Sequence, residues 1–251
     1  LRASAALDLL QDRLARESME LRAWSALALA SIGDPSSLPL FADALLKEME
    51  LLRGPRRDAM AAWFISAAFS RMNDSSVLPR LTSLLTGDDP HSHYVGGKLF
   101  GWLCDDREFL PILLRFVEQH RTGWEEVAHA LARIGDPSAV HVLKRAIRLW
   151  DHRKWRNQGL VAAEALCLLG HQGLAASHRL LKDRDPYVRR AAIHGIVIYG
   201  GPESQEALEV AAQDEDSHVK LTARAELLGR KRGEAKKTTP LHVRRDWGPS
   251  L

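Results

Sequence analysis

A short turn motif that recurs about every thirty residues constrains the fold of this chain more than any other feature. In its fullest form an apolar residue precedes Gly-Asp-Pro, as in Ile32–Pro35 and Ile134–Pro137. Weaker copies complete a series of seven marks at positions 33, 73, 104, 135, 170, 200 and 229, spaced 29 to 40 residues apart. A period of this length predicts an array of helix-turn-helix repeats.

The residues of the motif end one helix and begin the next. Glycine or asparagine takes the left-handed conformation that closes a helix, as expected at Gly33 and Asn73. The aspartate that follows caps the next helix, and proline fits the first turn because no amide hydrogen is needed there. Each repeat is therefore predicted to be a first helix, a tight turn and a second helix.

Residues around the marks repeat with helical spacing. The positions one and four residues before each mark are apolar in all seven repeats, and the position five before is small in five of them. In the second helices, apolar residues eight and twelve past the mark share one face. The fifth repeat breaks this stripe, and Leu180 and Leu181 are expected to replace it after a one-residue slip.

These patterns give approximate helix ranges. The first helices are predicted over 18–32, 57–72, 90–103, 123–134, 157–169, 186–199 and 218–228, and the second helices over 36–51, 75–86, 106–119, 137–150, 173–182 and 203–213. Residues 3–15 look like a second helix without its first. Because one helix pair cannot bury its apolar face alone, stacked repeats must supply the core. We predict an all-α solenoid (superhelix) of about six to seven helix-pair repeats over residues 1–233, with 1–17 as a partial or capping repeat and 234–251 as a basic C-terminal tail.

Charge and composition narrow the function classes. The formal net charge is +3, and residues 217–251 hold nine Lys or Arg against three acids, so the first 216 residues carry 3 − 6 = −3. The basic character therefore belongs to the tail. No apolar run approaches 18 residues and no signal peptide is present, which predicts a protein without a membrane span. Two distant cysteines, Cys104 and Cys167, fit buried reduced thiols in a cytoplasmic protein.

Several residues resemble a known repeat family. They are the stretch Asp185–Ala192 (Asp-Pro-Tyr-Val-Arg-Arg-Ala-Ala), the pair Leu21-Arg22 and the two Gly-Asp-Pro turns. Arg22 and Arg189 both lie eleven residues before their marks. The pattern resembles the HEAT-repeat family, especially its short bacterial HEAT-like or PBS-lyase form. The second and third repeats lack the Val-Arg opening and the glycine turn, so we expect a local bend there.

The most distinctive local segment runs from Trp150 to Arg156, at a repeat junction. Tryptophan and arginine dominate interface hot spots, so the segment is a candidate partner-binding patch. Its alternative role is to cap the apolar edge between two repeats. The candidate residues are Trp150, His152, Arg153, Trp155 and Arg156.

A second candidate is a basic track on the second helices. Arg80, Arg107 and Arg145 lie opposite the apolar stripe, and the resemblance places second helices on the concave side of a HEAT stack. Such a track would attract an acidic partner or phosphates. Acidic residues share this face, and the alternative is a merely solvated surface.

Catalytic and metal-binding motifs are weak. His91 and His93 form the one close histidine pair and lack a third ligand nearby in sequence. No His-Glu dipeptide occurs, which argues against the di-iron chemistry of HEAT-type hydroxylases, and no phosphate loop or nucleophile elbow is present. We expect no catalytic residue, metal or cofactor.

The leading hypothesis is a non-catalytic scaffold or adaptor that binds a protein or peptide, of acidic character if the basic track forms the contact. One alternative is a nucleic-acid-binding solenoid similar to the HEAT-like alkylpurine DNA glycosylases, with Trp150, Asp151, Trp155 and Arg145 as the residues in question. A second alternative, implied by the PBS-lyase resemblance, is a lyase or chaperone for a linear tetrapyrrole.

Overall fold

A computed structural model describes residues 2–16, 18–52, 60–119, 122–149, 158–200 and 202–231. Within these ranges all regular structure is helical, and the helices pack in pairs as a HEAT-repeat solenoid. The predicted fold class is therefore confirmed. Within the same ranges, no helix combines the length and apolar character that a membrane crossing requires.

The helix bounds follow the predicted ranges closely. The first helices are α2 (Met19–Ile32), α4 (Met60–Met72), α7 (Pro90–Leu103), α9 (Trp124–Ile134), α11 (Gln158–Leu168), α13 (Pro186–Tyr199) and α15 (Ser217–Lys231). The second helices are α3 (Leu38–Leu52), α5 (Leu78–Leu81) with α6 (Ser83–Thr86), α8 (Leu110–Glu118), α10 (Ala139–Leu149), α12 (His171–Leu180) and α14 (Pro202–Ala211). The additional helix α1 spans Arg2–Arg16, and 3-10 turns at Pro35–Ser37 and Arg107–Phe109 precede α3 and α8.

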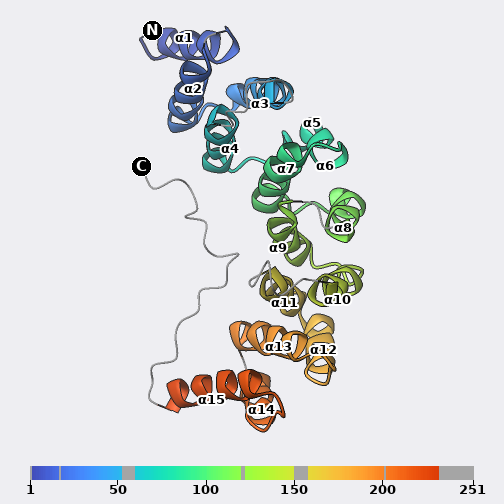
Figure 1. Ribbon diagram of the computed structural model, residues 1–251. Helices are drawn as coiled ribbons and strands as arrows, with labels where there is room; N and C mark the ends of the chain where they lie inside the picture. The colour runs from blue at the N-terminus through green and yellow to red at the C-terminus, as the bar shows by residue number, and fades with distance from the viewer. Residues whose placement is uncertain are drawn as a thin grey trace. The chain divides into compact units, whose positions relative to one another are not determined.

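The chain divides into two compact units. Unit 1 contains the described residues of Leu1–Cys104 and Arg121–Val127, and unit 2 those of Asp105–His120 and Ala128–Arg245. In unit 1, α2 packs against α4 and α4 against α7, which gives a row of first helices beside α3, α5 and α6 (Figure 1). In unit 2, α11 packs against α13 and α13 against α15, beside α10, α12 and α14 (Figure 1).

The predicted turn chemistry is present at most of the marks. Gly33, Gly135 and Asn73 have positive φ angles of 76°, 71° and 49°. Each closes its helix with an amide hydrogen bond to the carbonyl oxygen four residues earlier. The third repeat differs: Cys104 is extended, with φ −86° and ψ 122°.

The apolar register is confirmed at its central position. Four residues before the marks, the first six repeats bury their side chain completely, while Ala225 of the last repeat is exposed. The residue directly before the mark behaves differently, because it lies at the helix end: Ile32, Tyr199 and Leu228 are exposed. In the fifth repeat, Leu180 is buried and Leu181 half-buried, as the slip predicts.

The continuous second helix predicted over 75–86 is wrong. The segment forms two four-residue helices, α5 and α6, that meet at Thr82. There the Thr82 hydroxyl donates to the Pro79 carbonyl oxygen at 3.2 Å, and the Leu85 amide bonds only three residues back. These tighter bonds interrupt the α-helical pattern in a repeat that also departs from the family sequence.

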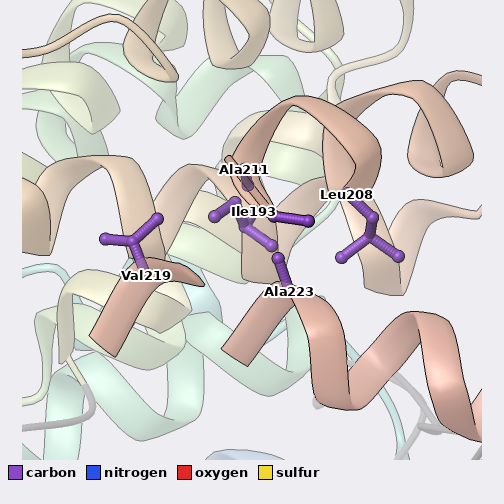
Figure 2. Packing of buried hydrophobic residues seen from close by; sticks show 6 residues of the cluster. Ile193, Leu208, Ala211, Val219 and Ala223 are labelled. Carbon is purple, nitrogen blue, oxygen red and sulfur yellow. The ribbon is translucent and has the colours of Figure 1, made fainter. Parts of the chain in front are cut away.

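Small residues and a buried ion pair hold the last repeats together. Figure 2 shows Ile193, Leu208, Ala211, Val219 and Ala223 converging between α13, α14 and α15. At the small position five before the mark, a Cβ on Gly195 would lie 2.4 Å from the Ala163 carbonyl oxygen, so glycine permits the close approach of α13 to α11.

The two family arginines make equivalent ion pairs in the first and sixth repeats. Arg189 donates from Nε and Nη2 to Asp214 at 2.8 and 2.6 Å, and both side chains are nearly buried. Arg22 pairs with Glu48 in the same way, from a first helix to the end of its second helix. The Arg at this register therefore joins the two helices of one repeat.

Candidate functional site

The predicted partner-binding residues fall into two groups. Trp150, His152, Arg153, Trp155 and Arg156 lie outside the described residues, as does the predicted tail over 234–251. The cations of the predicted basic track lie inside them.

Two of those three cations are engaged in ion pairs. Arg80 donates to Asp43 at 2.6 Å, and Arg107 pairs with Asp136. Arg145 is exposed on α10. Since acids from neighbouring second helices neutralise Arg80 and Arg107, the track attracts phosphates or acidic peptides less than the sequence suggests.

The histidine and cysteine candidates have structural roles. His93 is buried, and its Nε2 lies 2.5 Å from the Gly87 carbonyl oxygen. Both cysteines are free and buried, and burial raises the pKa of the Cys167 thiol to about 11. Across the ranges that the structure describes, His, Cys, Asp and Glu side chains form no group of three that could hold a metal ion.

A cluster that the sequence did not single out lies on the row of first helices in unit 1. The Lys98 ammonium lies 5.8, 5.1 and 5.3 Å from the ring centroids of Trp63, Tyr94 and Trp102, and 2.6 Å from Glu126 Oε1. Distances below 6 Å are typical of cation–π interactions. Together with Glu125, these five residues form what we call the aromatic face.

Helical spacing on α7 explains half of this arrangement. Tyr94, Lys98 and Trp102 follow one another at intervals of four, so they share one side of the helix. Asp89 caps α7 through the amides of His91 and Ser92, and Pro90 occupies its first turn, which fixes where the helix begins. Trp63 reaches the same side from α4, with its ring centroid 5.6 Å from that of Tyr94.

Glycines on α7 explain how the acidic residues reach Lys98. A Cβ on Gly97 would lie 2.4 Å from the Gly123 carbonyl oxygen, and one on Gly101 would lie 2.3 Å from the Glu126 Cβ. Because neither position carries a side chain, the first turn of α9 packs directly on α7. This close approach brings Glu125 and Glu126 beside Lys98.

The electrostatics of the aromatic face are unusual for a surface cluster. Burial by itself lowers the pKa of Lys98, but the Glu126 carboxylate and the Tyr94 side chain outweigh it, so the pKa is raised and the ammonium stays charged. Burial raises the pKa of Glu125 to about 7, and the neighbouring Glu126 adds to the increase. A half-buried carboxyl that titrates near neutral pH is a common property of binding and catalytic sites.

Exposed aromatic surface continues onto α2. The ring centroids of Trp24 and Phe64 lie 5.7 Å apart, and Trp24 and Trp63 are 57% and 42% exposed. Large exposed aromatic side chains on neighbouring helices are typical of recognition surfaces. Unit 1 therefore offers aromatic rings, one cation and two carboxylates on one row of helices.

A register signal for this cluster exists in the sequence. Trp63, Tyr94 and Glu125 each lie ten residues before their marks at 73, 104 and 135, and Lys98 lies six before. The sequence analysis compared the apolar positions of the first helices and searched the second helices for cations. Comparing the outward positions of the first helices would have aligned these residues.

Comparison with known proteins supports the repeat assignment. Residues 152–228 match the family described as HEAT repeats, and residues 21–47 match the PBS lyase HEAT-like repeat. The chain thus carries HEAT repeats, one of them of the PBS-lyase form.

A solved structure has the same fold. It is the complex of CpcE and CpcF of phycocyanin lyase from Nostoc sp. PCC7120, with a TM-score of 0.53 and 17% sequence identity over 96% of this chain and 92% of that chain. Identity at this level establishes likeness of fold alone. The search of curated proteins gave no match.

Proposed function

We propose that this protein is bilin lyase-like and binds a linear tetrapyrrole on the aromatic face of unit 1. The observation that carries the proposal is the combination of exposed rings with one cation and two carboxylates. Trp63 and Tyr94 present ring surface, and Lys98, Glu125 and Glu126 lie beside them.

The chemistry of a linear tetrapyrrole complements each part of this face. Its conjugated rings stack on aromatic side chains, which contribute about 0.5–1.5 kcal/mol per pair beyond area burial. Its propionates suit a lysine ammonium, and its pyrrole N–H groups are donors for carboxylates. A ligand lacking either the anionic or the donor groups would leave part of the face unused.

The comparisons add independent support. The PBS lyase HEAT-like match over 21–47 contains Trp24, which extends the exposed aromatic surface, and the fold is shared with a phycocyanin lyase complex. Because fold alone does not define function, the proposal depends on the aromatic face rather than on the likeness.

Titration with biliverdin tests the proposal. We expect a change in bilin absorbance and quenching of tryptophan fluorescence that saturate at one bilin per chain, and loss of both in the double variant Trp63→Ala/Tyr94→Ala. Tyr187→Ala is the matched control, because Tyr187 is an exposed aromatic residue on α13 in unit 2. Equal binding by the wild type and the double variant would exclude the aromatic face.

Protein docking is a second candidate function, favoured by a different observation. Large apolar side chains are exposed in the last repeats of unit 2: Tyr199, Val210, Leu221 and Leu228. The structurally similar CpcE forms a complex with CpcF, which makes a protein partner a reasonable expectation for this chain. Leu221→Asp/Leu228→Asp should abolish capture of a protein partner while leaving biliverdin titration unchanged.

The nucleic-acid hypothesis stays a prediction. It depends on Trp150, Asp151 and Trp155, which lie outside the described residues, and on Arg145. Fluorescence anisotropy with duplex DNA at about 50 mM salt, where phosphate contacts are strong, tests it directly.

A further inference from the structure

Glu125 occupies a defined place on the aromatic face. It lies ten residues before its mark, at the same register position as Trp63 on α4 and Tyr94 on α7, whose rings lie 5.6 Å apart. The close packing of α9 on Gly97 and Gly101 brings Glu125 within the electrostatic influence of Lys98 and Glu126. Glu125 therefore continues the row that the two aromatic residues begin.

The net charge of the face depends on this residue. The titratable groups around Glu125 are Lys98 and Tyr94 from α7 and Glu126 from α9 itself, while the side chain that α4 contributes, Trp63, does not titrate. The Lys98–Glu126 ion pair sums to zero charge. The face is consequently neutral when Glu125 is protonated and carries one negative charge when Glu125 is ionised.

We propose that Glu125 sets the charge of the aromatic face, so that an anionic planar ligand binds more tightly when the Glu125 carboxyl is protonated. The identity of the ligand as a linear tetrapyrrole rests on the function proposed above. The pKa of Glu125, raised by burial to about 7, places the change between pH 6 and pH 8. Ligand binding on this face is then proton-coupled.

The test uses the full chain and two anionic aromatic probes, biliverdin and 8-anilinonaphthalene-1-sulfonate, titrated at pH 6, 7 and 8. For the wild type we expect dissociation constants about three- to ten-fold larger at pH 8 than at pH 6, the effect of one nearby charge in a partly aqueous site. Glu125→Gln should bind at pH 8 as tightly as the wild type at pH 6. Glu206→Gln, at an exposed glutamate on α14, should behave like the wild type.

The outcomes separate this inference from the proposed function. If the dye shows the Glu125-dependent pH profile and biliverdin does not bind, the tetrapyrrole assignment fails and the charge control stands. If biliverdin binds but the wild type and Glu125→Gln share one pH profile, the charge control fails and the tetrapyrrole assignment stands. Absence of binding by both probes overturns both.

Discussion

Helices α7 and α13 are the same structural element with two different outward surfaces. Both are 14 residues long, and each begins with an aspartate cap followed by proline. Both bury the apolar residue four before the mark, Phe100 in α7 and Ile196 in α13. At the positions ten, six and two before the mark, however, Tyr94-Lys98-Trp102 of α7 corresponds to Arg190-His194-Ile198 of α13. The repeat thus fixes the core and leaves the chemistry of the outward row open.

The partners of the outward row differ as well. Lys98 pairs with Glu126 of the following first helix at 2.6 Å, and three rings surround its ammonium. His194 instead lies 3.2 Å from Glu164 of the preceding first helix. Glu164 is only 1% exposed, and its second oxygen has no hydrogen-bond partner among the described residues. α7 therefore presents its charged groups toward a solvent-accessible face, whereas α13 directs its pair into the core.

The largest expected effect concerns the position eleven before the mark, where α13 has Arg189 and α7 has His93. Replacing Arg189 with Met leaves Asp214 nearly buried without its cation, which should cost about 3–5 kcal/mol of unfolding free energy. Urea unfolding followed by circular dichroism measures this loss. Arg190→Met, on the next residue, should change stability by less than about 1 kcal/mol.

A double variant and pH sharpen this prediction. Arg189→Met/Asp214→Asn should regain part of the lost stability, since the uncompensated charge is gone. The Arg189 hydrogen bonds lower the pKa of Asp214, so the pair contributes stability above the ordinary aspartate pKa near 4 and loses it as pH falls further. The stability difference between wild type and Arg189→Met should therefore shrink below pH 4. A difference independent of pH would show that the pair is not its source.

The next largest effect tests the glycines that bring helices together. Gly101→Ala places a Cβ 2.3 Å from the Glu126 Cβ, and Gly195→Ala places one 2.4 Å from the Ala163 carbonyl oxygen. Each should destabilise its unit by about 1–3 kcal/mol. Only Gly101→Ala should also weaken biliverdin binding, because it moves Glu125 and Glu126 away from Lys98.

Gly229→Ala provides the matched control. No atom lies within 4 Å of the added Cβ, so a neutral or slightly stabilising change is expected from helix propensity. Comparable losses in all three variants would mean that close helix approach is not what these glycines provide.

The contrast between α7 and α13 also explains what the sequence predicts and what it does not. The bounds 90–103 and 186–199 follow from local signals, because an Asp-Pro cap and an apolar stripe act within one helix. The break at Thr82 was missed, since Pro79 one residue into a short helix is compatible with a continuous one.

The aromatic face was missed for a different reason. Its contacts join α4, α7 and the start of α9, and they depend on how closely Gly97 and Gly101 let neighbouring helices approach. Sequence reasoning favoured the Trp150–Arg156 segment because its cations and rings are adjacent in the chain. Adjacency in a repeat protein is set by register instead, so residues thirty positions apart are the relevant neighbours.

The smallest expected effect tests whether the outward rows differ energetically. Lys98→Met removes the cation from three rings and leaves Glu126 beside Glu125, which should cost about 1 kcal/mol because the Lys98 and Glu126 side chains are only 12% and 26% exposed. His194→Gln keeps a donor for Glu164, so its change should stay within about 0.5 kcal/mol. Tryptophan emission should shift in Lys98→Met, whose cation lies over Trp63 and Trp102, and not in His194→Gln. Equal thermal midpoints and equal emission spectra for the two variants would remove the energetic distinction between α7 and α13, and with it the argument that the aromatic face is organised around Lys98.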